Sequence, residues 1–213
     1  MEKRFIVARF VSTLMMVWVV FASEPVFAQD VVGAGKTDLS IVAGGWVSFA
    51  APDARPEPSF GEYVIGGNLS FAPLPWMGVE AELLAGLRRS QELKFGSTRT
   101  VTTKAPPVFM DAVNLVIPFL GDQRSVVPFV TAGIGETTIN RLRDVGQADT
   151  ETFFTGNIGG GVKLYSSGRW AYRVDYRYLL IRSEAQAPGT FFGREERKAQ
   201  RITGSLVLKL IAR

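Results

Sequence analysis

The feature that most constrains this chain is a strict alternation of side-chain character over residues 170–180. Every even position there is aromatic or aliphatic, while Arg173, Asp175 and Arg177 occupy odd positions between them. Successive side chains of a β-strand point to opposite faces of the sheet. The pattern therefore predicts a strand with one wholly apolar face and one charged face.

The same period of two recurs along the chain. It is clear in four further segments and weaker in three: 62–71, 77–88, 154–164 and 202–211, then 38–50, 108–119 and 127–139. Asp111 falls on the apolar face of its segment and Trp46 on the polar face, which indicates rim positions or a β-bulge. We therefore expect eight strands of about ten residues or more.

The lengths of the connections separate a soluble sandwich from a membrane barrel, since both alternate. Short and long connections take turns, short near 72–76, 120–126 and 165–169, and long near 51–61, 89–107, 140–152 and 183–199. Transmembrane barrels have tight periplasmic turns and longer outer loops. Trp76 and Trp170 lie at the short-turn end, where an aromatic girdle is expected. The predicted fold is all-β, an eight-stranded antiparallel up-and-down transmembrane β-barrel, closed because open sheet edges cannot be satisfied in lipid.

The first 28 residues have the composition of a signal peptide. Lys3, Arg4 and Arg9 precede an almost uncharged apolar stretch over 10–22, and compact residues lead up to Ala28. A membrane anchor needs ~20 apolar residues, more than this stretch provides. We expect export and cleavage after Ala28. The predicted divisions are a signal peptide, a lead-in and a barrel domain: 1–28, 29–37 and 38–213.

Composition excludes several functions. The chain has no cysteine and no histidine, which removes thiolate sites and the usual general base and zinc ligand. We therefore expect no catalytic site, no metal and no cofactor. The net charge of +4 is scattered without a dense basic run, so nucleic acid is not an expected partner.

Two glycine-containing motifs have ordinary interpretations. Residues 32–37 resemble the end of a phosphate-binding loop, but Asp30 stands where that loop requires glycine. The run Gly159 to Gly161 lies inside a predicted strand, where it indicates tight packing or a kink in a curved wall.

The charged faces predict a network inside the barrel. Its members are six inward-facing residues on the third, sixth and seventh strands: Glu80, Glu82, Lys163, Arg173, Asp175 and Arg177. The third and seventh strands lie opposite each other in an eight-stranded barrel, whose interior is just wide enough for side chains to fill. Since isolated buried charges are costly, we expect Glu80 and Glu82 to pair with Arg173 or Arg177 across the lumen. The network then closes the lumen to bulk flow; the alternative is a narrow or gated pore.

Three segments, 128–135, 156–165 and 170–178, carry a resemblance to a known family. They resemble the small outer-membrane β-barrel family that groups OmpA-like, OmpW-like and opacity-type proteins, in particular its single-domain members. The resemblance implies a non-catalytic structural or surface-interaction role, with outer-membrane lipid, lipopolysaccharide and the assembly machinery as partners. The alternative it implies is an OmpW-like pore or transporter for small or apolar solutes. Family members usually end in an aromatic residue, and here Leu210 stands in that place.

The outer loops are the remaining candidates for binding. Segment 88–107 has a net charge of +4, and segment 183–199 contains two adjacent phenylalanines beside charged residues. The candidate residues are Arg88, Arg89, Lys94, Arg99, Lys104, Phe191 and Phe192. Basic loops there suit phosphates of lipopolysaccharide or host polyanions. Ordinary solvated loops are the alternative for these segments, and a soluble periplasmic barrel is the alternative for the whole chain.

Overall fold

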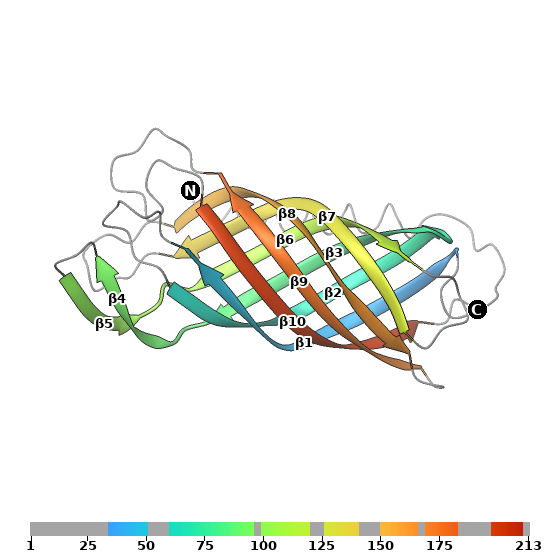
Figure 1. Ribbon diagram of the computed structural model, residues 1–213, viewed down its shortest axis with the longest axis horizontal. Helices are drawn as coiled ribbons and strands as arrows, with labels where there is room; N and C mark the ends of the chain where they lie inside the picture. The colour runs from blue at the N-terminus through green and yellow to red at the C-terminus, as the bar shows by residue number, and fades with distance from the viewer. Residues whose placement is uncertain are drawn as a thin grey trace, which may run out of the picture.

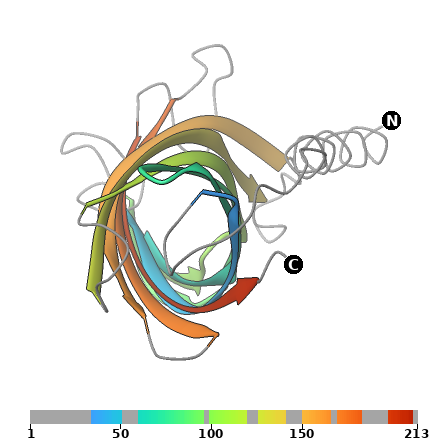
Figure 2. The ribbon, with the colours of Figure 1, turned by 90° about the vertical axis from the view of Figure 1, so that its right-hand side faces the viewer.

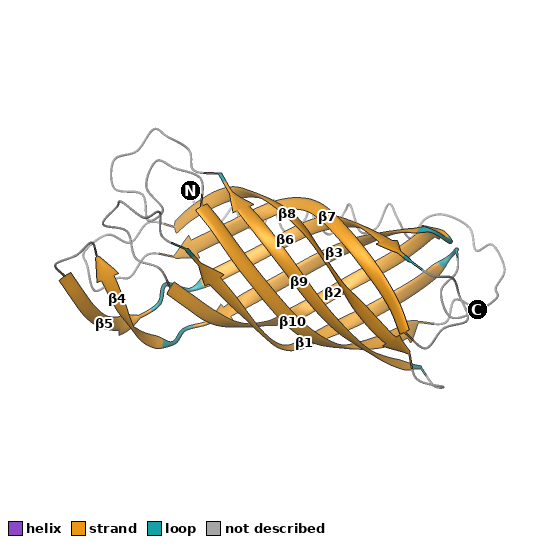
Figure 3. Ribbon diagram, viewed as in Figure 1, coloured by secondary structure: helices purple, strands orange, loops and turns teal. Residues whose placement is uncertain are grey.

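The computed structural model describes seven stretches of the chain: 34–50, 60–95, 99–119, 126–140, 150–165, 169–182 and 197–210. These residues form strands, turns and short irregular links, with no helix among them (Figure 3). Within this part of the chain there is accordingly no helix long and apolar enough to cross a membrane. The expected signal peptide lies outside the described residues.

Eight strands close into a barrel in which all neighbours are antiparallel (Figures 1 and 2). They are β1 (Lys36–Phe49), β2 (Phe60–Leu74), β3 (Met77–Leu87), β6 (Val108–Pro118), β7 (Val126–Asn140), β8 (Thr150–Tyr165), β9 (Trp170–Ile181) and β10 (Arg197–Leu210). Pairing of β1 with β10 completes the ring. The predicted eight-stranded antiparallel barrel is confirmed.

The two ends of the barrel differ. The connections β2–β3, β6–β7 and β8–β9 meet at one end, which we call the short-turn end (Figure 1). The four longer connections meet at the other, the long-loop end. Trp76 and Trp170 are both exposed at the short-turn end, as expected for an interfacial girdle.

The wall of the barrel is apolar outside and polar inside. On β9, Tyr172 and Val174 are exposed on the outer surface, whereas Arg173, Asp175 and Arg177 are buried in the lumen. A soluble protein hides its apolar side chains, but a barrel in lipid presents them to acyl chains.

A β-bulge changes the phase of β1. The pairing of β1 with β10 shifts by one residue between Val42 and Gly44. The extra residue reverses which side chains face the lumen, so Trp46 points outward. There its ring meets that of Tyr63 edge-on, with the ring centroids 5.0 Å apart. Asp111 needs no bulge. It lies on the outer face beside Glu136, near the long-loop end of a regularly paired β6.

The segment 89–107 is not the single loop that the sequence predicts. It contains a hairpin, β4 (Ser90–Phe95) and β5 (Arg99–Lys104), which extends beyond the barrel wall (Figure 1). The Gln91 side chain joins its base to β2, with Nε2 donating to the Gly61 carbonyl at 2.9 Å and Oε1 accepting from the Gly61 N–H at 3.1 Å. These six-residue strands are too short and too evenly polar for alternation to reveal them.

The barrel strands also extend beyond their predicted ends. β1 begins at Lys36, inside the predicted lead-in, and β10 begins at Arg197, inside the predicted outer loop. The second difference matters for the site, because it places Arg197 and Arg201 in the barrel wall.

An apolar cluster occupies the lumen toward the long-loop end. Its buried members include Val47, Phe49, Phe60, Val64, Leu84, Val108, Met110, Ile139, Phe153, Leu179 and Ile181. Phe49 and Phe60 stack with ring centroids 4.6 Å apart. This part of the lumen is therefore a packed core.

Candidate functional site

Six charged side chains meet in the middle of the lumen, and we call them the charged layer. They are Glu80 and Glu82 on β3, Arg173, Asp175 and Arg177 on β9, and Arg201 on β10. In the order of the ring, β3 and β9 are four places apart, so they face each other across the barrel. Each of the six residues is at most 4% exposed, so their charges have to be balanced by one another.

Glu80 is the centre of the layer. Arg173 makes a two-pronged contact with its carboxylate, through Nη1 to Oε2 and through Nη2 to Oε1. Arg177 Nη2 lies 2.7 Å from Oε1, and the Ser70 hydroxyl donates to Oε2 at 3.0 Å. One carboxylate from β3 thus holds two arginines from the opposite strand.

The other two carboxylates complete the balance. Asp175 accepts from Arg177 Nε at 3.0 Å and also pairs with Arg173. Glu82 contacts Arg201 at 2.7 Å and Arg177 at 3.6 Å. Every carboxylate therefore touches two arginines, and three negative charges offset three positive ones. Such mutual pairing is what a desolvated charge network requires.

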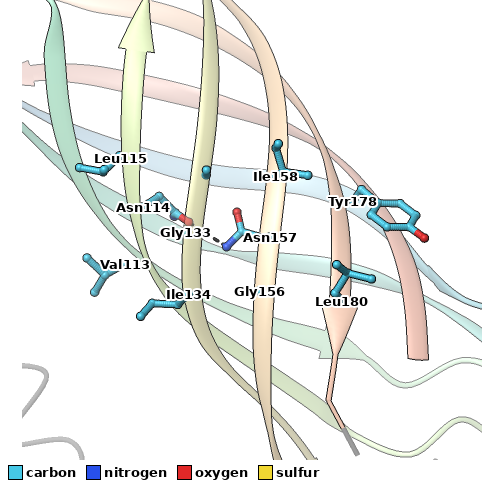
Figure 4. Close-up of a pocket in the computed structure, with 11 residues that line it drawn as sticks. Val113, Asn114, Leu115, Gly133, Ile134, Gly156, Asn157, Ile158, Tyr178 and Leu180 are labelled. Carbon is cyan, nitrogen blue, oxygen red and sulfur yellow. Dashed lines mark hydrogen bonds between the residues drawn. The ribbon is translucent and has the colours of Figure 1, made fainter. Parts of the chain in front are cut away.

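Two asparagines close the network into a ring. Arg177 Nη1 donates to Asn157 Oδ1 at 3.2 Å, Asn157 Nδ2 donates to Asn114 Oδ1 at 2.9 Å, and Asn114 Nδ2 reaches Glu80 Oε1 at 3.5 Å. Figure 4 shows the Asn157–Asn114 bond. The two residues are on β8 and β6, and Gly133 of the intervening β7 pairs with both. A Cβ on Gly133 would overlap Asn114 Oδ1, so the bond depends on glycine there.

The glycine run of β8 serves the same layer. A Cβ on Gly159 would lie 3.0 Å from Arg177 Cγ, and one on Gly161 would lie 2.8 Å from Phe129 Cζ. The Phe129 ring in turn carries the Arg173 guanidinium 4.6 Å from its centroid. The closest atoms to both added Cβ positions are backbone carbonyl oxygens of β9, those of Tyr176 and Val174. The run therefore permits a close approach of the β9 backbone and leaves space for large side chains in the lumen.

The structure brings together five of the six residues expected in the lumen. Lys163 is the exception, because it pairs with Asp38 at 2.9 Å toward the short-turn end. Arg201 was absent from the prediction because the predicted last strand begins only at residue 202, whereas β10 begins at Arg197. Asn114 and Asn157 carried only a weak signal, since they are uncharged residues on inward-facing positions.

The loop residues are not gathered into one site among the residues that the structure describes. Arg88 Nε donates to the Ala105 carbonyl at 3.4 Å, and Lys104 is exposed at the end of β5. Arg89 lies over the rings of Trp46 and Tyr63 on the outer wall. The side chains of Lys94 and Arg99, and the residues Phe191 and Phe192, lie outside the described part of the chain.

A hollow of about 560 Å³ lies on the barrel wall over β6 to β9 (Figure 4). Most of its lining is apolar, with the outward side chains of Leu115, Ile134 and Ile158 around the small residues Ala132 and Gly156. A Cβ at Gly156 would meet open space. An apolar hollow of this kind suits contact with lipid acyl chains. Neither here nor elsewhere among the described residues do three or more acidic side chains or other metal ligands form a cluster that could hold a metal ion.

Comparison with known proteins decides the family. The sequence profile described as "Outer membrane protein beta-barrel domain" matches residues 17–209. The chain belongs to this family. Its place is therefore the outer membrane. No curated protein sequence matches the chain.

Three solved structures show the same fold as this outer-membrane barrel. Neisserial surface protein A (NspA) has a TM-score of 0.57 and 9% identity, covering 84% of this chain and 99% of that one. OprG from Pseudomonas aeruginosa has a TM-score of 0.51 and 14% identity, covering 86% and 100%. The N-terminal barrel domain of Pseudomonas aeruginosa OprF has a TM-score of 0.50 and 9% identity, covering 83% and 99%.

Proposed function

We propose that this chain is a non-catalytic outer-membrane protein with a structural or surface-interaction role, whose lumen is closed to bulk flow. The observation that carries the proposal is the filling of the lumen in two consecutive levels. The charged layer joins opposite walls through Glu80, and the apolar cluster packs the space between it and the long-loop end. Water and ions have no wide path past two such levels.

The absence of catalysis is supported by composition and geometry. The chain contains no histidine, and every carboxylate of the charged layer is engaged by two arginines. A general base needs an available lone pair near its substrate, which these carboxylates do not offer.

The alternative, a pore or transporter for small or apolar solutes, expects a continuous cavity between the charged layer and the outside. In the described residues, that part of the lumen holds the side chains of the apolar cluster. At the short-turn end the lumen has a small recess of about 60 Å³, lined in part by Asp38 and Lys163. The observations therefore favour the closed barrel.

Conductance in planar bilayers tests the proposal. The purified, refolded full chain is expected to produce no stable current steps, and a porin of known conductance inserted into the same membrane serves as the positive control. Large, stable single-channel currents from the wild-type chain would show that the lumen is open.

Export with cleavage after Ala28, and insertion by the assembly machinery with Leu210 in the usual aromatic position, belong to the same proposal. Mass spectrometry of the mature protein purified from outer membranes measures the first directly. A mature chain that begins elsewhere than Gln29 would contradict the cleavage site.

A further inference from the structure

Three side chains form a cluster on the outer wall at the long-loop end, and we call it the rim cluster. Trp46 of β1 and Tyr63 of β2 are directly paired, with their rings edge to face at an angle of 76°. Arg89 follows the end of β3, with its guanidinium carbon 6.0 Å from the Trp46 centroid and 5.9 Å from the Tyr63 centroid. One cation therefore lies over two rings at once.

The rim cluster is held by several parts of the fold. The β1 bulge turns Trp46 outward, and its indole covers Gly61, where a Cβ would overlap the ring. Gln91 of the hairpin hydrogen-bonds both the N–H and the carbonyl of Gly61. A site fixed in this way loses little conformational freedom when it binds a ligand.

The level of the rim cluster matches that of lipid headgroups. Trp46 pairs with Ile202, and Tyr63 is followed on the same face by Ile65; both isoleucines are exposed on the apolar outer wall. On the other side of the cluster begins the polar hairpin. Tryptophan and tyrosine at such a boundary lie at the membrane interface, here that of the outer leaflet because the long connections face outward.

The chemistry of Arg89 selects an anion. The Arg89 side chain is exposed, and no carboxylate among the described residues forms an ion pair with it, so its N–H groups are available to a ligand. Arginine in this arrangement binds phosphate through two parallel hydrogen bonds. Resting on the proposed placement in the outer leaflet, we propose that the rim cluster binds a phosphorylated glycolipid headgroup, that of lipid A. Arg89 donates to a phosphate, and Trp46 and Tyr63 pack against the sugar.

Native mass spectrometry of the refolded full chain in detergent, titrated with bis-phosphorylated lipid A, tests this assignment. Arg89→Gln is expected to weaken binding at least about tenfold, because the variant loses the charge-assisted hydrogen bonds to the phosphate. Arg169→Gln is the matched control, since it removes the same charge from an exposed arginine at the short-turn end, and it is expected to leave binding unchanged. Equal losses in both variants would show unspecific charge attraction and overturn the proposal.

A second variant and two further ligands complete the test. Trp46→Leu keeps every charge and is expected to weaken binding a few-fold by removing the ring beneath Arg89; unchanged binding would overturn the role of the rings. Lipid A without phosphates is expected to bind at least about fivefold more weakly. Equal binding of that lipid, or of inorganic phosphate, would exclude a phosphorylated headgroup as the ligand. Neither result bears on the proposal that the lumen is closed, because the conductance measurement tests that proposal independently of Arg89.

Discussion

At the scale of single residues, the charged layer is stabilised by balance rather than by any one ion pair. Glu80 contacts both Arg173 and Arg177 while almost no solvent reaches it. Removing one charge from a neutral buried network leaves another uncompensated, which costs far more than an exposed pair contributes.

Glu80→Gln is therefore expected to lower the free energy of unfolding by about 3–5 kcal/mol. Adding Arg177→Gln to Glu80→Gln restores neutrality, because two carboxylates and two arginines then remain in the layer. The double variant should therefore recover part of the lost free energy of unfolding. Urea unfolding of the refolded barrel in vesicles, followed by heat-modifiable gel migration, measures both. Strictly additive losses would show that charge balance does not govern the layer.

Gly133 and Gly156 provide a matched pair of glycine substitutions. Gly133→Ala forces the Asn157–Asn114 bond apart, since the added methyl overlaps Asn114 Oδ1, and should destabilise the barrel by about 1–3 kcal/mol. Gly156→Ala places its methyl in open space on the outer wall and should cost nothing. The same unfolding assay compares them, and equal effects would mean that loss of chain flexibility alone is being measured.

The alternation predicts which residues face the lumen but not which of them meet. Glu80 and Arg177 are 97 positions apart, and their contact depends on the register of every strand between them. Registers follow from the closed ring as a whole, which no local pattern records. The Asn114–Asn157 bond was unpredictable for the same reason, because it requires Gly133 at one particular place between two other strands.

At the scale of elements, period two predicts a strand well wherever the period is unbroken. It succeeds for β9, where eleven consecutive residues keep the pattern, and it is blurred in β1, where the bulge reverses the phase between Val42 and Trp46. It fails for β4 and β5, which form a separate two-stranded sheet outside the barrel and need no apolar face.

Deletion of Ala43 tests the interpretation of the bulge. Val42 pairs with Ser205 and Gly44 with Gly204, so removing the residue between them leaves a regular strand with every other side chain on its present face. We expect this variant to refold and keep heat-modifiable migration. Deletion of Ile202 from the regularly paired β10 moves half of that strand to the wrong face and should abolish refolding. Failure of both deletions would show that the bulge is itself required.

At the scale of the whole molecule, the barrel assigns a different task to each surface. The outer wall is apolar, the lumen holds paired charges and apolar side chains, and the long-loop end carries the hairpin and the rim cluster. Interaction with anything beyond the membrane therefore falls to one end of the molecule, provided that this end faces outward.

That orientation can be measured directly because the chain contains no cysteine. Lys104→Cys puts an exposed thiol on the hairpin at the long-loop end, and Arg169→Cys puts one at the short-turn end. A membrane-impermeant maleimide is expected to label the first on intact cells and the second only after the outer membrane is disrupted, because short turns face the periplasm. A periplasmic marker protein with a free thiol must stay unlabelled in the intact cells. Labelling of the Arg169→Cys variant alone would invert the orientation and remove the basis for a lipid site in the outer leaflet.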